Sequence, residues 1–202
     1  MAASYKDKGK DSFKTKLQMY LFELGIEGKV DSANSDGFND YEISTDIVKI
    51  FTTQYWQHND FQYKSKKIES EKLYNTIKQW EDNNAKDIKS WFDPYFKNKF
   101  REKFPKSFFN TLINKESCFY CGMNDKILKQ LQENQQIFKK SFRGWSLEID
   151  RINSNFEYSE INCVMACYWC NNAKTDEFTK CEFKEVGAVI SGIWKARLKK
   201  NS

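Results

Sequence analysis

The 202-residue sequence has a single histidine, His58, and lacks several signals of targeting and repetition. It has no apolar run near the ~18 residues of a membrane span, and no basic and then apolar leader of a secretory signal. We therefore expect a cytoplasmic protein without a membrane partner. There is no internal repeat and no low-complexity tract beyond a lysine and asparagine bias. With 40% hydrophobic and 16% aromatic residues, the chain has enough apolar material for a packed core.

Six cysteines are present, and four of them form two CxxC pairs, in CFYCG and CYWCN. Two such pairs supply the four sulfurs that tetrahedral zinc accepts. Two disulfides or unrelated thiols are the alternatives, but CxxC is a poor disulfide geometry and a reducing compartment favours metal. Cys163 and Cys181 are then expected to be buried thiols. The four expected zinc ligands are Cys118, Cys121, Cys167 and Cys170.

The long gap between the pairs predicts a knuckle turn for the first pair and a distant helix start for the second, which is a treble-clef arrangement. Within the gap, the alternation in LEIDRI predicts one strand, and CVMAC predicts another. The chain then enters a helix at CYWCNNAK. Two strands and a helix are expected to bring Asp150 and Asn171 near each other. Their carboxylate and amide oxygens are hard ligands that suit Mg²⁺ or a similar ion such as Mn²⁺.

At these residues the sequence resembles the HNH, or ββα-metal, endonucleases. The resemblance covers roughly residues 115–185 and implies structural zinc, a catalytic divalent ion held by Asp150 and Asn171, and contact of Lys174 with nucleic acid. Asn162 is implied to be either structural or adjacent to a phosphate. The matching positions are Cys118, Cys121, Asp150, Asn162, Cys167, Cys170, Asn171 and Lys174.

Arg151 stands where the family most often has the histidine that deprotonates the attacking water. DRINSNFEYSEIN resembles an Asp-Arg variant found in a subset of the family. A guanidinium stays protonated, so it cannot be a general base, but it can bind a phosphate oxygen and stabilise transition-state charge. His58 is the candidate base because its ordinary pKa lies near neutral pH, although a surface or capping histidine is the alternative. Tyr158, Glu148 and a metal-bound hydroxide are further candidates.

Residues 1–110 are expected to form a helical module and residues 111–202 the zinc-bound nuclease core with a terminal helix. The predicted fold class is therefore mostly helical α+β, with a C-terminal ββα-metal (treble-clef) core. Residues 1–11 are expected to be a loose terminus and residues 30–40 a turn-rich loop. Apolar spacing and capping residues predict the helices. Their expected starts or caps are Phe13, Ser44 or Thr45, Asp93-Pro94, Asn124 or Asp125, and the capping-box pair Thr179 and Glu182, with a further helix through Leu73, Ile77 and Trp80.

The formal net charge is +5, and the basic residues are clustered. Such clusters fit contact with a phosphate backbone, although solvated helix faces are the alternative. Together with the resemblance they predict an endonuclease acting on nucleic acid, with double-stranded DNA as the expected partner and restriction, mobile-element or phage-defence settings as family associations. A catalytically lapsed nucleic-acid-binding module and a protein-interaction domain are the alternatives. The helical module is expected to read DNA, to form a homodimer or to dock a protein partner. The three clusters are Lys64, Lys66 and Lys67; Lys97, Lys99, Arg101, Lys103 and Lys106; and Lys195, Arg197, Lys199 and Lys200.

Overall fold

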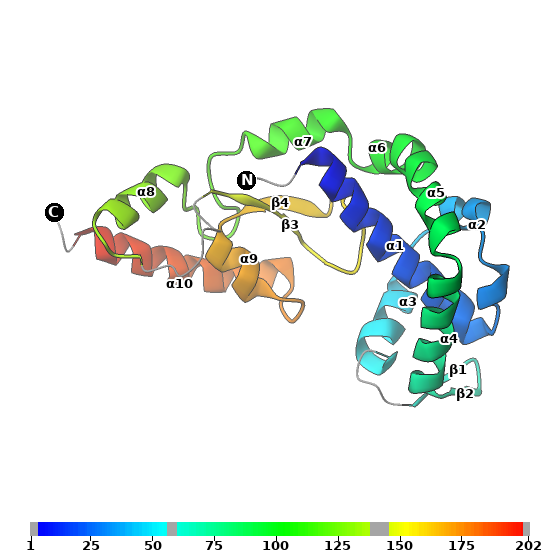
Figure 1. Ribbon diagram of the computed structural model, residues 1–202. Coiled ribbons are helices and arrows are strands. Elements are labelled where there is room, and N and C mark those ends of the chain that lie inside the picture. The colour runs from blue at the N-terminus through cyan, green and yellow to red at the C-terminus, as the bar shows by residue number, and fades with distance from the viewer. Residues whose placement is uncertain (1–3, 56–59, 138–145, 200–202) are drawn as a thin grey trace. The chain divides into compact units, whose positions relative to one another are not determined.

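The computed structural model describes residues 4–55, 60–137 and 146–199 of the chain (Figure 1). Contacts divide the chain into two compact units. One, here called the cysteine unit, comprises Met1–Tyr5, Phe104–Ser154 and Tyr158–Ser202. The other, here called the helical unit, comprises Lys6–Lys103 and Asn155–Glu157. Three residues of the connection between the last two strands thus belong to the helical unit.

The helical unit is built from short helices and one hairpin around an aromatic core. Its core is formed by buried side chains of α1, α3, the following π-helical turn, the hairpin and α4. Its elements are α1 (Tyr5–Glu27), η1 (Val30–Ser32), α2 (Ser35–Asp40), α3 (Thr45–Ile50), η2 (Phe51–Tyr55), β1 (Phe61–Tyr63), β2 (Lys66–Ile68), α4 (Ser70–Asn83), α5 (Ala85–Tyr95), η3 (Phe96–Phe100) and α6 (Arg101–Lys103).

The first helix begins earlier than the sequence predicts. The expectation of a loose terminus over residues 1–11 is wrong for its described part, because α1 already begins at Tyr5. The Tyr5 hydroxyl donates to the carbonyl of Phe104 at 2.6 Å. Gly9 is buried, and a Cβ there would lie 2.4 Å from the ring of Phe96. Packing against distant aromatic residues therefore holds this polar stretch in a helix.

Side-chain caps define the next helices. The turn-rich loop expected over residues 30–40 is partly wrong, because Asn34 caps α2 by accepting from the amide of Gly37 at 2.9 Å. Ser44 caps α3 as predicted, accepting from the amide of Ile47 at 3.1 Å.

Pro94 lies inside α5 and does not start a helix. The predicted start at Asp93-Pro94 is therefore wrong. A proline lacks the amide hydrogen of the regular ladder and its ring crowds the preceding turn. Directly after Tyr95 the chain continues as the π-helical turn η3, a wider geometry that often accompanies such interruptions. The helical run ends at Lys103, two residues before Pro105.

The hairpin β1–β2 has no counterpart among the sequence predictions. Its strands are antiparallel and pair Tyr63 with Lys66. The two residues between them, Lys64 and Ser65, have φ angles of 48° and 64°. Positive φ at both central positions is the geometry of a two-residue hairpin turn, which is usually made by asparagine and glycine. The sequence therefore lacks the usual signal for this turn.

A buried polar cluster lies within the helical unit. Glu157, which is 5% exposed, accepts from the hydroxyl of Tyr95 at 2.6 Å and from the ammonium of Lys103 at 2.7 Å. Burial lowers the pKa of Lys103, but the charge of Glu157 and hydrogen bonds to Glu157 and Glu42 outweigh it, so the pKa is raised. The charges of this cluster compensate one another.

Within its described residues, the cysteine unit contains an antiparallel strand pair and four helices. Strands β3 and β4 pair Asp150 with Val164. Both strands and the helix after them were predicted. Asn124 caps α8, as expected, by accepting from the amide of Ile127 at 2.9 Å. The elements are α7 (Lys106–Ile113), α8 (Asp125–Glu133), β3 (Glu148–Arg151), β4 (Cys163–Ala166), α9 (Tyr168–Lys174) and α10 (Lys180–Lys199).

Helix α10 packs against the first CxxC turn. The capping box at its start is confirmed, since Thr179 and Glu182 exchange backbone and side-chain hydrogen bonds at 2.8 and 3.3 Å. At Gly187 a Cβ would lie 2.6 Å from a backbone atom of the first CxxC turn, so only glycine permits this approach. One expectation is wrong here, because Cys181 is exposed.

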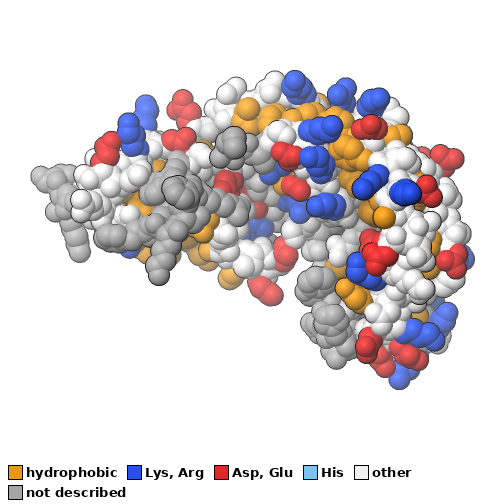
Figure 2. Space-filling model, viewed as in Figure 1, with side chains coloured by type: hydrophobic (Ala, Val, Ile, Leu, Met, Phe, Trp, Pro, Cys, Tyr) orange, Lys and Arg blue, Asp and Glu red, His pale blue; other side chains and the backbone are white. Residues whose placement is uncertain are grey.

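In the part of the chain that the structure describes, the fold class is thus mostly helical α+β with two small sheets. Within residues 4–55, 60–137 and 146–199, every helix is too short or too polar to span a lipid bilayer. On the face seen in Figure 2, lysine and arginine side chains are interspersed with acidic ones. Parts of the predicted basic clusters are ion-paired, since Lys64 lies 3.3 Å from Glu27 and Lys67 lies 3.3 Å from Asp60. Part of the positive charge of this cluster is therefore compensated by neighbouring carboxylates.

Candidate functional site

Four buried cysteines form a compact cluster in the cysteine unit. Their sulfur atoms all lie within 4.8 Å of one another, and the Cys121 and Cys167 sulfurs are 3.6 Å apart. Zinc bonds of ~2.3 Å in a tetrahedron place sulfurs about 3.8 Å apart, whereas a disulfide needs about 2.05 Å. All four are free cysteines. The cluster, formed by Cys118, Cys121, Cys167 and Cys170, therefore fits zinc and excludes the disulfide alternative.

Two local structures present these sulfurs. In the first pair, the amide of Gly122 donates to the carbonyl of Cys118 at 2.9 Å, and Gly122 has a φ of 69°. That conformation favours glycine and closes a tight turn. In the second pair, Cys167 is the N-cap of α9 and Cys170 lies in its first turn. Hydrogen bonds among the four sulfurs lower the pKa of Cys118 and raise the pKa of Cys167 and of Cys170, so a bound cation is needed for all four to be thiolates together.

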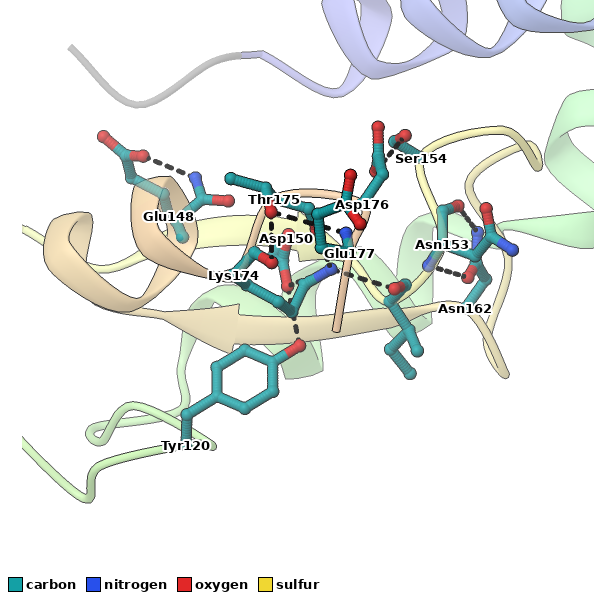
Figure 3. Close-up of polar contacts among 12 residues, drawn as sticks. Tyr120, Glu148, Asp150, Asn153, Ser154, Asn162, Lys174, Thr175, Asp176 and Glu177 are labelled. Atoms are coloured by element: carbon teal, nitrogen blue, oxygen red, sulfur yellow. Dashed lines mark hydrogen bonds and ion pairs between the residues drawn. The ribbon is translucent and has the colours of Figure 1, made fainter. Parts of the chain in front are cut away.

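Tyr120 joins the first CxxC turn to Asp150. Its hydroxyl donates to Oδ2 of Asp150 at 2.8 Å, and both side chains are buried, at 6% and 7% exposed (Figure 3). The ring is held by Phe183, at a centroid distance of 5.2 Å. Burial raises the pKa of Tyr120, so the hydroxyl keeps its proton and acts as a donor.

Lys174 approaches the same carboxylate oxygen. Its ammonium lies 4.0 Å from Oδ2 of Asp150 and donates to the carbonyls of Ile152 at 2.9 Å and Thr175 at 3.3 Å. Only 2% of Lys174 is exposed. Burial raises the pKa of Asp150, whereas the Tyr120 hydrogen bond and the charge of Lys174 oppose that rise. Contact of Lys174 with a nucleic-acid phosphate stays a prediction.

Thr175, directly after α9, has an unusual backbone. Its φ is 49° and its ψ is −158°, a region occupied almost only by glycine. Its hydroxyl donates to the carbonyl of Lys174 at 2.7 Å, and its own carbonyl accepts from the Lys174 ammonium. The strained turn therefore supplies one of the acceptors that hold Lys174.

Helix α9 lies along the face of β3 that carries two carboxylates. Glu148 and Asp150 are two positions apart in the strand and so point to the same face. Asn171 and Lys174 are three positions apart on α9 and so share a helix face. The amide of Asn171 donates to Oε2 of Glu148 at 2.8 Å. Lys174 faces Asp150 (Figure 3). Asn171 thus contacts Glu148, whereas Tyr120 and Lys174 are the side chains that approach Asp150.

Arg151 and Asn162 have other surroundings. Arg151 is the last residue of β3, and its guanidinium lies 5.1 Å from the ring centre of Tyr158, which is 6% exposed. Asn162 is buried and exchanges hydrogen bonds of 3.0 Å with the backbone of Asn153 in both directions. These hydrogen bonds join the beginning and the end of the connection between β3 and β4. The predicted phosphate contact of Arg151 stays a prediction.

The predicted base, His58, lies outside the residues that the structure describes. Sequence reasoning gave no role to the Tyr120 hydroxyl or to the carbonyl of Thr175. The Tyr120 contact joins residues 30 positions apart, and the sequence has no local signal for it. The alternation of Glu148 and Asp150 was visible and could have indicated that Glu148 faces the same helix.

Comparisons with known proteins give one structural similarity. No protein-family model matches the chain, and no curated protein matches its sequence. Among solved structures, the chain is similar to the rare-cutting HNH restriction endonuclease PacI, at 29% sequence identity and a TM-score of 0.39. The match covers 46% of this chain and 66% of PacI, just under two thirds of that protein. A TM-score of this size does not establish a shared fold.

Proposed function

We propose that this chain is a metal-dependent HNH-type endonuclease that hydrolyses phosphodiester bonds in double-stranded DNA. The supporting observation is the alignment of α9 along β3. It sets Asn171 beside Glu148 and Lys174 beside Asp150, next to the four-cysteine cluster. Glu148 and Asp150 lie two positions apart on β3, roughly 7 Å between Cα atoms, and Asn171 contacts the first of them, so Asp150 and Asn171 offer hard oxygens along one face.

This donor set fits Mg²⁺ or Mn²⁺. Both cations prefer carboxylate and amide oxygens and keep several positions for water and phosphate. Asp150 uses Oδ2 for Tyr120, which leaves Oδ1 for a cation. Asn171 donates its NH₂ group to Glu148, which leaves its carbonyl oxygen for the same cation. When bound, the divalent ion stabilises the negative charge that develops on the scissile phosphate.

In this proposal the chain's own side chains have separate roles. Asp150 and Asn171 hold the ion and orient the phosphate beside it. Arg151 binds a phosphate oxygen, since its guanidinium is a permanent cation that forms paired hydrogen bonds. The four-cysteine cluster, with zinc, supports the turn and the helix that carry these groups.

The proton acceptor is proposed to be His58. A His58→Ala variant is expected to lose most cleavage while keeping its zinc content, because histidine is the side chain with an ordinary pKa near neutral pH. Tyr158→Phe is the matched comparison, since it removes a hydroxyl from beneath the Arg151 guanidinium. Full activity of the His58 variant with loss in the Tyr158 variant would move the role to Tyr158.

The second candidate is a nucleic-acid-binding module without catalysis. The observation that favours it is the position of Arg151, which stands where the resemblance expects the base and packs over Tyr158. This alternative predicts salt-sensitive DNA binding without cleavage in any divalent ion. A protein-interaction domain would neither bind nor cleave DNA.

The deciding experiment is cleavage of plasmid DNA by the zinc-loaded protein with Mg²⁺ or Mn²⁺. Wild type is expected to nick and linearise the plasmid, and Asp150→Ala is expected to be inactive with unchanged zinc content. Glu133→Ala is the matched control, because Glu133 is a surface carboxylate of the same unit with a side chain 64% exposed. Equal cleavage by wild type and the Asp150 variant would defeat the assignment.

A further inference from the structure

We infer that Tyr120 is a positioning residue that connects the sulfur cluster to the divalent-ion site and works on Asp150 together with Lys174. The inference rests on the proposed function, because it assigns these two side chains a task in holding the proposed cation ligand. The Tyr120 hydrogen bond links the zinc-binding turn to the Asp150 carboxylate, and the Lys174 ammonium links the end of α9 to the same carboxylate.

The first step concerns which oxygen of Asp150 is occupied. The Tyr120 hydroxyl, at 2.8 Å, and the Lys174 ammonium, at 4.0 Å, both approach Oδ2. Among the residues that the structure describes, Oδ1 has no protein hydrogen-bond partner. The carboxylate is therefore held through Oδ2, and Oδ1 is left available for a ligand. A cation reaching this face would bind Asp150 through Oδ1 alone.

The second step concerns the rigidity of Tyr120. The tyrosine lies between the two cysteines of the first CxxC pair, and the amide of the neighbouring Phe119 donates to the carbonyl of Met165 on β4 at 2.8 Å. Phe183 packs against its ring, and Gly187 allows α10 to approach its backbone. The hydroxyl thus has a position set by the sulfur cluster, the sheet and α10 together.

The third step concerns Lys174. A buried ammonium is stable only when its hydrogens and charge are compensated. Here the carbonyls of Ile152 and Thr175 take two hydrogens, and the carboxylate of Asp150 supplies the opposite charge. Because Ile152 follows β3 and Thr175 follows α9, Lys174 fastens the ends of both elements around Asp150.

Groups that hydrogen-bond to metal-binding carboxylates orient them, and their removal typically weakens metal affinity or activity about 10- to 100-fold. Tyr120→Phe removes only the hydroxyl and keeps the ring that packs against Phe183. We expect zinc content and thermal unfolding to stay as in wild type, and the Mn²⁺ dissociation constant to rise about 10- to 100-fold.

The test is a titration of the zinc-loaded full chain with Mn²⁺ alone, followed by electron paramagnetic resonance of the free ion. Tyr74→Phe is the control, because Tyr74 is 48% exposed and lies in the helical unit. Plasmid cleavage at saturating and at low Mn²⁺ is recorded in parallel. We expect Tyr120→Phe to regain much of its activity at saturating Mn²⁺, and Tyr74→Phe to match wild type throughout.

The outcomes separate the inference from the proposed function. If wild type binds Mn²⁺ and cleaves DNA while Tyr120→Phe has the same Mn²⁺ affinity, the inference is overturned and the proposed function stands. If Tyr120→Phe loses zinc in parallel with Mn²⁺, the inference is also overturned, since the hydroxyl would then act through the sulfur cluster itself. If wild type neither binds Mn²⁺ nor cleaves, the proposed function fails and the inference fails with it.

Discussion

Replacing Lys174 with methionine removes a buried ammonium and leaves a side chain of similar length. The change strands two carbonyls, those of Ile152 and Thr175, and leaves the Asp150 carboxylate without a cation at 4.0 Å. A fully buried carbonyl without a donor costs about 1–3 kcal/mol, and here the cost lies at the low end, because Ile152 is half-buried and Thr175 is exposed, so water can replace part of the lost donor. At 4 Å and an effective dielectric of about 20, the lost attraction is about 4 kcal/mol before hydration is considered.

The cost of the unpaired carbonyls and the lost attraction to Asp150 cannot simply be added, because the desolvation of the same buried groups contributes to both. Measured losses for breaking one side of a buried ion pair are about 3–5 kcal/mol, and we expect a destabilisation of this size for Lys174→Met. The loss is a large share of the ~5–15 kcal/mol that stabilises a typical domain. It should be confined to the cysteine unit, to which all four residues belong.

The suitable assay is native-state hydrogen exchange of the β3 and β4 amides in the zinc-loaded protein, since it reports the opening of one unit. A loss of 3–5 kcal/mol corresponds to roughly two to four powers of ten in protection. Lys129→Met is the control, because the Lys129 side chain is 76% exposed and its ion pair with Glu133 spans 3.9 Å. Such surface changes stay within about 0.5 kcal/mol. An equally small effect of Lys174→Met would refute the reasoning.

Three further predictions concern other parts of the chain. Removing zinc with a chelator should unfold the cysteine unit, because structural zinc contributes ~10–16 kcal/mol in isolated zinc-finger peptides, whereas exchange protection of the helical core should persist. Thr175→Gly should stabilise the cysteine unit by about 1 kcal/mol, since glycine tolerates the observed φ, whereas Thr175→Val should not stabilise it. If the strain is absent, thermal melts would place Thr175→Val above Thr175→Gly. The Lys103 pKa is raised in the fold, so its stabilising contribution is fully present below pH 10.5 and is lost as pH rises through the raised value. The stability gap between wild type and Lys103→Met should therefore be constant from pH 8 to 10 and shrink above it in urea titrations; a gap that shrinks at neutral pH would contradict this.

Local signals in the sequence were sufficient for the centre of the fold. CxxC spacing, a short alternating strand and capping residues depend on neighbours within a few positions, so the four-cysteine cluster, β3, β4 and the capping box around Thr179 were all predictable. The same holds for the Asn124 cap. The caps and strand patterns are decided by local backbone chemistry, and CxxC spacing fixes each pair of sulfurs locally, although the two pairs meet only in the fold.

Features set by distant partners were not predictable. The polar start of α1 is helical because Tyr5 and Gly9 meet aromatic residues about a hundred positions away, and the sequence around them has no apolar periodicity. Pro94 remains inside α5 although a proline usually ends a helix. Thr175 adopts a conformation that its β-branched side chain disfavours. The link from Tyr120 to Asp150 likewise depends on tertiary packing.

The most direct test of the central claim, that Asp150 and Asn171 together hold a divalent cation beside the sulfur cluster, is the stoichiometry of Mn²⁺ binding to the zinc-loaded chain. We predict one tightly held Mn²⁺ for wild type, and loss of that ion in both Asp150→Ala and Asn171→Ala with zinc content and exchange protection of the strands retained. Undiminished Mn²⁺ binding by the two variants, or none by wild type, would contradict it.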